Sequence, residues 1–428
     1  MSALTSQTAR LHALAVGVGL LALSLVHFAR YWGSPPIPLL YGAAALVGFP
    51  VVGWVLHRGG YRGDALLLPV TAAIVGLGLA QIYRLQPSLM LRQATWVCLG
   101  FALLLGTLQL ARDPSRLARY RYLSAAAALS LLGAALVFGV ERGGARQWID
   151  LGFVSFQPSE AVKVLLVVFL AAYLSEHGKW ITEGRSRPLE LRALGPVVVM
   201  LALSLLLLVV QRDLGGALLY FAIVLLMVYA ATGRGDYVLV GAAAFVVGAA
   251  VCYLAFAHVR VRIDAWVDPW RDLPGAGYQI AQALFALGSG GLVGTGLGLG
   301  HPDLIPAVHT DLIFAAVAEE LGFAGAVGVI LLYALLLARA FGIALRAQPN
   351  VSRLLATGAA CVLAVQTLLI LGGATRLLPL TGITLPFMSY GGSSIVSNFV
   401  LLGLLHAVSH EAASPIRRSE RQDGRPHP

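Results

Sequence analysis

Charged side chains within long apolar segments are the first candidates for chemistry in this sequence. Glu160 and Lys163 stand three residues apart at the start of one such segment, so a helix would place them on the same face. Burying a charge in a membrane-spanning helix is costly, which makes each such residue a functional hypothesis. Two interpretations stay open for the pair: a structural ion pair that neutralises itself, or the lining of a polar cavity that binds a charged substrate.

Asp311 lies where a long loop enters another apolar segment, directly after a His-Thr pair. An acid at a helix start can simply stabilise the helix dipole, which would keep the carboxylate ionised and make it a weak base. The same carboxylate could instead take a proton from an attacking hydroxyl or bind a cation. Glu319 and Glu320 lie deeper in this segment and need partners. We expect these partners to be Arg376, Lys163 or a cation.

Polar side chains also gather in 386–398, where the last apolar segment begins. They can cap and pack that helix, or they can line a cavity for a hydroxyl-rich ligand. His309 has no second histidine at ligand spacing, which argues against a zinc site. The glycine run 288–300 lacks the Lys-Ser/Thr pair of a phosphate-binding loop, so it predicts flexible or tightly packed backbone.

The composition places these residues in a membrane. Of the 428 residues, 58% are hydrophobic and 12% are charged, with a mean hydropathy of +0.81. Soluble domains carry about 25% charged residues, so an ordinary soluble enzyme, a disordered protein and a nucleic-acid-binding domain are excluded. The net charge of +10 is mostly arginine, which membrane orientation explains better than binding to a polyanion. The three cysteines fit buried apolar positions.

The apolar pattern predicts an all-α polytopic membrane protein with about twelve transmembrane helices. A span needs about 20 mostly apolar residues, and suitable segments are 12–30, 37–57, 66–83, 91–111, 122–140, 159–176, 193–211, 214–232, 237–257, 312–338, 353–374 and 390–410. Arginine and lysine are more frequent in the inner loops if both termini are cytoplasmic. Residues 258–311 then form a long external loop before the tenth span, with 278–300 as a re-entrant or interfacial element.

Several segments, in order along the chain, resemble motifs of the SEDS family (shape, elongation, division and sporulation), which includes RodA and FtsW. Residues 147–160, which end in Phe-Gln-Pro-Ser-Glu, resemble the family's cavity motif. The other matches are Asp268-Pro-Trp270, Gly277-Tyr-Gln279, the glycine run, Pro306-Ala-Val-His-Thr-Asp311, Glu319-Glu-Leu-Gly322 and Leu385-Pro-Phe-Met-Ser-Tyr-Gly-Gly-Ser-Ser394. One match alone would be weak, but the ordered set over about 66–410 is specific.

The resemblance implies a peptidoglycan glycosyltransferase. Such enzymes polymerise lipid II, an undecaprenyl-pyrophosphate-linked disaccharide-pentapeptide, at the outer face of the bacterial cytoplasmic membrane. They usually act with a class B penicillin-binding protein, a transpeptidase. We therefore expect lipid II, membrane lipids and this transpeptidase as partners, and no nucleic acid. A divalent cation, Mg²⁺ or Mn²⁺, is the expected cofactor, with Asp311 and Glu160 as candidate ligands and no organic cofactor.

The family's essential aspartate falls on Asp311, the predicted catalytic residue, and its cavity acid and lysine fall on Glu160 and Lys163. Two departures, Gln147 for a common arginine and Arg212 for a proline, concern the subfamily and leave this site unchanged. The other polar residues expected to bind substrate are Arg146, Trp148, Gln157, Ser159, Gln279, His309, Thr310, Ser389, Ser393, Ser394 and Asn398.

Two other functions are weighed against polymerisation. A lipid II flippase or other transporter would predict inverted repeats and polar residues that continue to the cytoplasmic side, and the sequence has neither feature. A non-catalytic scaffold for a transpeptidase would tolerate loss of Asp311. The predicted organisation is an added two-helix segment at 1–65, a SEDS-like membrane domain at 66–410, and a disordered cytoplasmic tail at 411–428.

Overall fold

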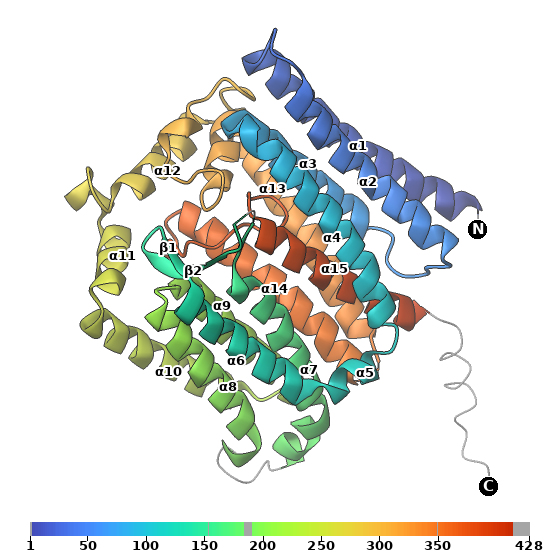
Figure 1. The fold of residues 1–428 in the computed structure, drawn as a ribbon, viewed down its shortest axis with the longest axis vertical. Helices are drawn as coiled ribbons and strands as arrows, with labels where there is room; N and C mark the ends of the chain where they lie inside the picture. Colours follow the sequence, from blue (N-terminus) through green and yellow to red (C-terminus); the bar gives the residue numbers. More distant parts are fainter. Residues whose placement is uncertain (1, 153, 184–190, 349, 414–428) are drawn as a thin grey trace.

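A computed structural model describes the chain except residues 1, 153, 184–190, 349 and 414–428, and it consists mainly of long helices (Figure 1). Each predicted span overlaps one of them. The long helices are α1 (Ser2–Arg30), α2 (Ile37–Arg58), α3 (Leu67–Leu85), α4 (Met90–Leu110), α6 (Arg121–Phe138), α7 (Pro158–Glu183), α8 (Leu191–Val210), α9 (Leu214–Thr232), α10 (Gly235–Ala255), α13 (Ile313–Arg346), α14 (Asn350–Ala374) and α15 (Gly392–Ala413). The short helices are η1 (Pro87–Leu89), α5 (Pro114–Arg119), α11 (Ala257–Val267), η2 (Pro269–Asp272), α12 (Tyr278–Ser289) and η3 (Pro302–Leu304).

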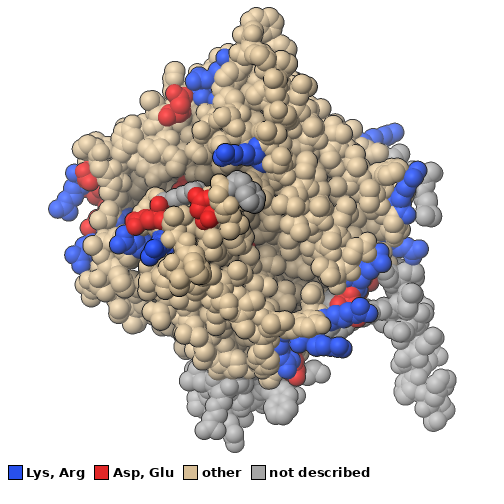
Figure 2. Space-filling model, in the orientation of Figure 1, with Lys and Arg blue, Asp and Glu red and all other residues tan. Residues whose placement is uncertain are grey.

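The surface of the helices matches a lipid environment. Among the described residues, 11 helices are long and apolar enough to cross a membrane, and α8 contributes a shorter apolar stretch, Leu194–Val210. Helix α10 is strongly apolar yet buries only Tyr237, as a helix surrounded by lipid would. In Figure 2 the charged side chains lie towards two opposite ends of the view, separated by a broad uncharged belt. The protein is therefore a multi-pass membrane protein.

The centre of the bundle consists of α3, α7, α14 and α15, which bury most of their residues. Helices α1 and α2 pack on the outside of α3 and α4 (Figure 1). Gly19 of α1 and Gly76 of α3 allow this contact, because a Cβ atom added at Gly19 would lie 2.9 Å from the Gly76 Cα atom. The two N-terminal helices are thus packed directly against the helices that surround the centre.

Helix α13 is interrupted, which the predicted single span at 312–338 did not include. Gly322 has φ 66° and ψ −169°, a backbone conformation that is almost restricted to glycine. At this break the glycine run binds α13 through its backbone. The Thr295 N–H donates to the Glu319 carbonyl at 3.0 Å, and the Phe323 N–H donates to the Gly291 carbonyl at 2.9 Å. The glycine run is therefore tightly packed backbone.

A buried ion pair joins α3 to α13 just before this break. The Arg84 Nε atom lies 2.6 Å from the Glu320 Oε1 atom, and the two side chains are 1% and 0% exposed. Arg84 also donates to the Gly300 carbonyl at 2.5 Å and contacts Asp303 at 3.2 Å. One arginine thus holds the central helix, the interrupted helix and the end of the glycine run together.

The two side chains predicted as partners of the adjacent acids, Arg376 and Lys163, are wrong. Glu319 accepts a hydrogen bond from the His301 backbone N–H at 2.7 Å. The Arg376 guanidinium instead donates to the Trp266 carbonyl at 2.9 Å. Lys163 pairs elsewhere, as described below. The missed partner, Arg84, lies within α3.

A small antiparallel sheet departs from the all-α prediction. It consists of β1 (Val140–Arg142), β2 (Ala145–Asp150) and β3 (Ser155–Phe156), in the order β1-β2-β3. The pairs Val140–Trp148 and Glu141–Arg146 leave Gln147 as an extra residue, which makes a bulge in β2. The fifth span was predicted to reach 140, but α6 ends at Phe138 because β1 begins there.

The long external loop is mostly helical. Residues 258–311 contain α11, η2, α12 and η3, which the prediction of a long external loop did not include apart from the element at 278–300. The proposed interfacial element 278–300 consists of α12 followed by the glycine run. At the other end of the chain, α15 continues to Ala413, so the tail does not begin at 411. Residues 414–428 of the predicted tail lie outside the described residues.

Candidate functional site

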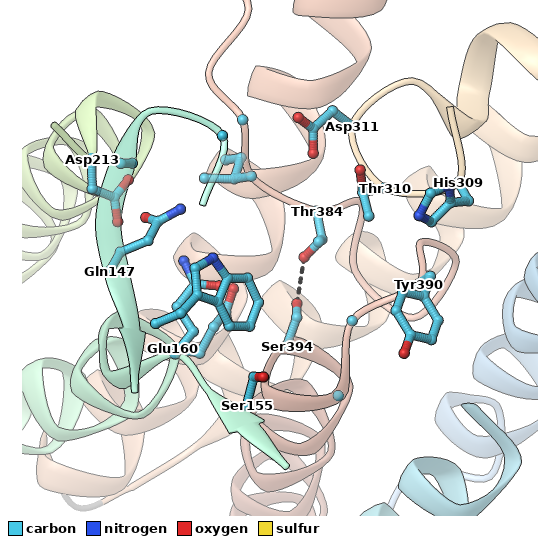
Figure 3. A pocket seen from close by; sticks show the side chains of 18 of the residues that line it. Gln147, Ser155, Glu160, Asp213, His309, Thr310, Asp311, Thr384, Tyr390 and Ser394 are labelled. Carbon is cyan, nitrogen blue, oxygen red and sulfur yellow. Dashed lines mark hydrogen bonds between the residues drawn. The ribbon is translucent and has the colours of Figure 1, made fainter. Parts of the chain in front are cut away.

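A cavity of about 810 Å³ lies beside the β1–β2 hairpin. Its walls come from this hairpin, the start of α7, the turn before α9, α11, the loop before α13 and residues 381–394, so distant parts of the chain meet around it. We call it the main cavity. Figure 3 labels ten of its side chains, which are Gln147, Ser155, Glu160, Asp213, His309, Thr310, Asp311, Thr384, Tyr390 and Ser394.

Asp311 lies in the turn before α13, at one side of the main cavity (Figure 3). Loss of solvent raises the pKa of its carboxyl group to about 6, although the Thr310 hydrogen bond and the Arg262 charge act in the opposite direction. Burial thus outweighs the stabilisation of the ionised form that a helix start provides. Asp311 is still mainly ionised at pH 7 but binds a proton more readily than an exposed aspartate.

The segment before α15 fixes the turn that carries Asp311. The Ser389 hydroxyl donates to the Thr310 carbonyl at 2.5 Å and accepts from the Leu385 N–H at 3.0 Å. The Tyr390 N–H donates to the His309 carbonyl at 2.9 Å. His309 and Thr310 line the main cavity, whereas Ser389 does not. Ser389, expected to bind substrate, is therefore placed to position the residues before Asp311.

Glu160 and Lys163 form an ion pair in which only the glutamate reaches the main cavity. The Lys163 Nζ atom lies 2.5 Å from the Glu160 Oε2 atom and donates to Gln366 at 3.0 Å and to Asn398 at 2.9 Å. Ser397 donates to the same Glu160 oxygen at 2.8 Å. The pair is therefore both a structural ion pair and, through Glu160, part of the lining of a polar cavity, which the sequence left open as alternatives. Lys163 and Asn398 lie behind Glu160 and do not line the cavity.

The remaining predicted residues divide between the cavity wall and its support. Trp148, Gln157 and Ser394 line the main cavity. Ser393 is not a lining residue but accepts the Gln157 backbone N–H at 3.0 Å. Ser159 lies behind the wall, and its carbonyl accepts the buried Tyr220 hydroxyl at 2.6 Å.

Two predicted substrate-binding residues lie away from the main cavity. Arg146 donates to the Gly139 carbonyl at 2.8 Å, while Gln147 and Trp148 line the cavity because the bulge turns both towards it. Arg146 therefore does not replace the missing arginine at 147. Gln279 donates to the Pro306 carbonyl at 3.0 Å and lines a second, smaller cavity.

Among the described residues, the arginines that line the main cavity are Arg92, Arg212 and Arg262. Sequence reasoning did not bring these three residues together. Arg92 and Arg212 were given no place in the site, and Arg262 counted only among the external-loop arginines that could neutralise a leaving pyrophosphate. Arg212 occupies the left-handed region at φ 64°, which is rare for a residue other than glycine, and lies 3.6 Å from Glu141 on β1. The sequence signal for Arg212 was that the family has a proline at this position.

Asp213 is a further missed residue. Its Oδ1 atom accepts the Gly216 N–H at 2.8 Å and caps α9, while its buried Oδ2 atom has no hydrogen-bond partner among the described residues. Burial raises the pKa of this carboxyl group, against the effects of the Gly216 N–H and of the Ser159 hydroxyl. Asp213 thus presents an unsatisfied acceptor beside the main cavity, opposite Asp311 (Figure 3).

The described residues do not form a metal site on their own. Among them, no group of three or more His, Cys, Asp or Glu residues is placed to hold a metal ion. Of the two expected ligands, Glu160 is already paired with Lys163, and Asp311 is left as a single carboxylate. Magnesium in enzymes is often held by one or two carboxylates together with substrate phosphates. The residues therefore fit a cation only if the substrate supplies further ligands.

Sequence comparisons place this architecture among known proteins. A sequence model of the FtsW/RodA/SpoVE cell cycle proteins matches residues 68–414. The chain is 39% identical to peptidoglycan glycosyltransferase RodA of Mycobacterium tuberculosis, covering 94% of this chain and 89% of that protein. It is 38% identical to stage V sporulation protein E of Bacillus subtilis, over 63% of this chain and 73% of that one.

Solved structures show the same fold. The rod shape determining protein RodA of Thermus thermophilus aligns with a TM-score of 0.60 and 33% identity, over 82% of this chain and 97% of its own. A chain from a peptidoglycan synthase complex that coordinates polymerization and crosslinking aligns with a TM-score of 0.69 and 34% identity, over 82% of this chain and 98% of its own.

Proposed function

The chain belongs to the FtsW/RodA/SpoVE family of cell cycle proteins, and from this membership and the main cavity we propose that it is a peptidoglycan glycosyltransferase that polymerises lipid II. The observation that carries the proposal is Asp311. It is a desolvated carboxylate in a polar, arginine-lined cavity on the side of the membrane protein where the hairpin and α11 lie. A prenyl-linked sugar can reach such a cavity while its lipid tail stays in the bilayer.

The reaction joins two lipid-linked sugars. The 4-hydroxyl oxygen of the acceptor attacks the anomeric carbon of the donor, and Asp311 takes the hydroxyl proton. The bond from that carbon to the phosphate oxygen breaks, and its electron pair leaves with the prenyl diphosphate. The raised pKa of Asp311 favours this role, since a carboxylate of higher pKa is a stronger base and is still ionised at pH 7.

The leaving diphosphate needs positive charge, which the sequence analysis assigned to Lys163 or to arginines of the external loop. Lys163 is 1% exposed and already bound to Glu160, Gln366 and Asn398. Arginine side chains are well suited to bind phosphate oxygens. Arg92, Arg212 and Arg262 are therefore the candidates to stabilise the leaving group, and at least one of them should contact it.

We also propose a divalent cation, Mg²⁺ or Mn²⁺, bound together with the substrate. Diphosphate oxygens would supply its ligands, since Lys163 neutralises Glu160 and Asp311 acts as the base. When bound, the cation would neutralise charge on the diphosphate.

Location and partner follow as further parts of the proposal. The excess of arginine and lysine in the inner loops supports a bacterial inner-membrane protein with both termini in the cytoplasm. The relative from a synthase complex that combines polymerization with crosslinking supports a class B penicillin-binding protein as partner.

The test is polymerisation of labelled lipid II by purified protein with such a partner, with and without divalent cation. Asp311→Asn keeps the size of the side chain but cannot accept the proton, and we expect it to lower the rate by about 100-fold or more. Asp264→Asn, on the exposed side of α11, is the control and should behave as wild type. Equal chains from both variants would remove Asp311 from the mechanism. No chains from folded, partnered wild type would favour transport or scaffolding.

A further inference from the structure

A second cavity, of about 190 Å³, lies on the other side of Asp311. We call it the small cavity. It shares three lining residues with the main cavity, Arg262, Asp311 and Gly382, so the two cavities meet at this point. Sites for whole ligands usually measure about 300–1,000 Å³. The small cavity can therefore hold only a part of a larger ligand, whereas the main cavity has room for sugars.

The walls of the small cavity are mostly apolar and come from α11, α12 and the segment after α14. The apolar lining residues are Val261, Ala265, Ala276, Ile280 and Leu380. Of its polar residues, Gln279 is already bound to the Pro306 carbonyl. The main cavity differs, because Gln147, Asp150, Thr384 and other polar residues line it. Such walls suit sugar hydroxyls, while those of the small cavity suit hydrocarbon.

Arg262 brings a positive charge to the junction of the two cavities. Among the described residues its side chain makes no hydrogen bond and no ion pair, although its charge lowers the pKa of Asp311. Its Nη1 atom and the Asp311 Oδ2 atom lie 4.0 Å and 3.8 Å from the position where Gly382 would carry a Cβ atom. An unpaired guanidinium beside an apolar cavity fits an amphiphile with an anionic, phosphate-containing head.

We infer that the small cavity holds the diphosphate and first isoprene units of the donor lipid, bound by Arg262, while the acceptor sugar occupies the main cavity. This assignment rests on the proposed function and adds where the donor and the acceptor bind. Asp311, in the shared wall, faces the acceptor hydroxyl on one side and the donor's reacting carbon on the other. After the acceptor oxygen bonds to that carbon, the prenyl diphosphate keeps the electron pair of the broken bond and leaves through the small cavity.

The surroundings of the small cavity suit a lipid chain. Helices α11 and α12 lie at the edge of the molecule, outside the central helices (Figure 1). They and η2 expose large apolar side chains, including Val267, Trp270 and Phe285 at 61%, 46% and 54%. Tryptophan and other aromatic side chains are typical of the membrane interface. A chain whose diphosphate is bound at Arg262 would thus meet an apolar rim next to the bilayer.

The first experiment measures binding of a sugar-free probe, undecaprenyl diphosphate with a photoreactive group on its first isoprene unit, to full-length protein without turnover. We expect cross-links to map to residues 261–280 in wild type. Arg262→Gln should weaken binding by about tenfold or more, because it removes a charged hydrogen-bond donor. Ala265→Trp, which fills the small cavity, should abolish these cross-links. Ala257→Trp, at an exposed position of α11 that lines neither cavity, is the matched control and should bind as wild type.

The second experiment measures inhibition of polymerisation by unlabelled undecaprenyl diphosphate. We expect Arg262→Gln to weaken this inhibition and to raise KM for lipid II, whereas Ala257→Trp should change neither. Cross-links in the main cavity, or equal probe binding by wild type and Arg262→Gln, would overturn the assignment. The probe requires no reaction, so binding to the small cavity without glycan synthesis would contradict the proposed function while supporting the lipid site.

Discussion

Asp311 must be ionised before the reaction and must still accept a proton during it. An exposed aspartate has a pKa near 3.9 and is a weak base. In this protein burial raises the pKa of Asp311 to about 6, despite the opposing effects of Thr310 and Arg262. The group is then still mainly a carboxylate at pH 7. His309 stays neutral there, because burial lowers its pKa.

The rate of polymerisation should therefore fall as the pH drops through about 6. The carboxylate form is present above this pKa and is lost below it, so the rate should fall about tenfold for each further pH unit. The measurement is initial rate against pH at constant, saturating cation. Lipid II binding, followed in parallel on Asp311→Asn, controls for a change in affinity. A rate that stays constant down to pH 4.5 would contradict Asp311 as the base.

The Glu160–Lys163 pair leads to a prediction about stability. Lys163→Met removes the positive charge and leaves Glu160 buried without its partner, which typically costs about 3–5 kcal/mol. Thermal unfolding in detergent should show a large loss for this variant. The double variant Glu160→Gln/Lys163→Met should recover part of that loss, because no buried charge is left unpaired. A double variant less stable than Lys163→Met alone would show that the charges do not act as a pair.

At the level of elements, the break in α13 depends on a single residue. Gly322 has a positive φ, and a Cβ atom there would lie 2.2 Å from the Gly294 nitrogen. Gly322→Ala should therefore destabilise the protein by about 1–3 kcal/mol or more and separate the glycine run from α13. Gly328→Ala is the control in the same helix, since its Cβ atom would meet nothing within 4 Å. Hydrogen exchange of residues 291–300 should rise only in Gly322→Ala.

The sequence predicted the long helices well and the short external elements poorly, for a physical reason. A spanning segment must be apolar over about 20 residues, so its signal is strong. Strands of two to six residues such as β1, β2 and β3 are too short to show a period, and their pairing depends on a bulge at Gln147. The break at Gly322 is invisible for a related reason, because its immediate neighbours, Leu321 and Phe323, are apolar and a single glycine is common in apolar helices.

The candidate site was predictable where the type of residue alone indicates its role, and not where the role depends on which neighbours the side chain contacts. Asp311 and Glu160 line the main cavity, as a buried acid in a membrane protein suggests. Lys163 does not, because Gln366 and Asn398 on other helices take its hydrogen bonds. The sequence could not show such contacts between distant helices, nor that Arg262 reaches the cavity from the external segment.

At the level of the whole molecule, the proposed orientation can be measured by cysteine labelling. In a variant without native cysteines, Leu292→Cys lies beside the break in α13 and Gln348→Cys lies just beyond its last residue, Arg346, and both positions are exposed. A membrane-impermeant maleimide should label position 292 in intact cells. Position 348 should react only after the inner membrane is permeabilised. The reverse pattern would place the main cavity on the cytoplasmic side and contradict polymerisation at the outer face.

The buried charges also constrain how the chain is made. Arg84 leaves the ribosome 236 residues before its partner Glu320, whereas Lys163 has its partner Glu160 in the same helix. At about 5–20 residues per second, Arg84 waits roughly 12–50 s for its partner. Helix α3 therefore enters the bilayer with an unpaired charge, and the nascent protein should depend on an insertase or lipid headgroups that shield Arg84 until α13 is translated.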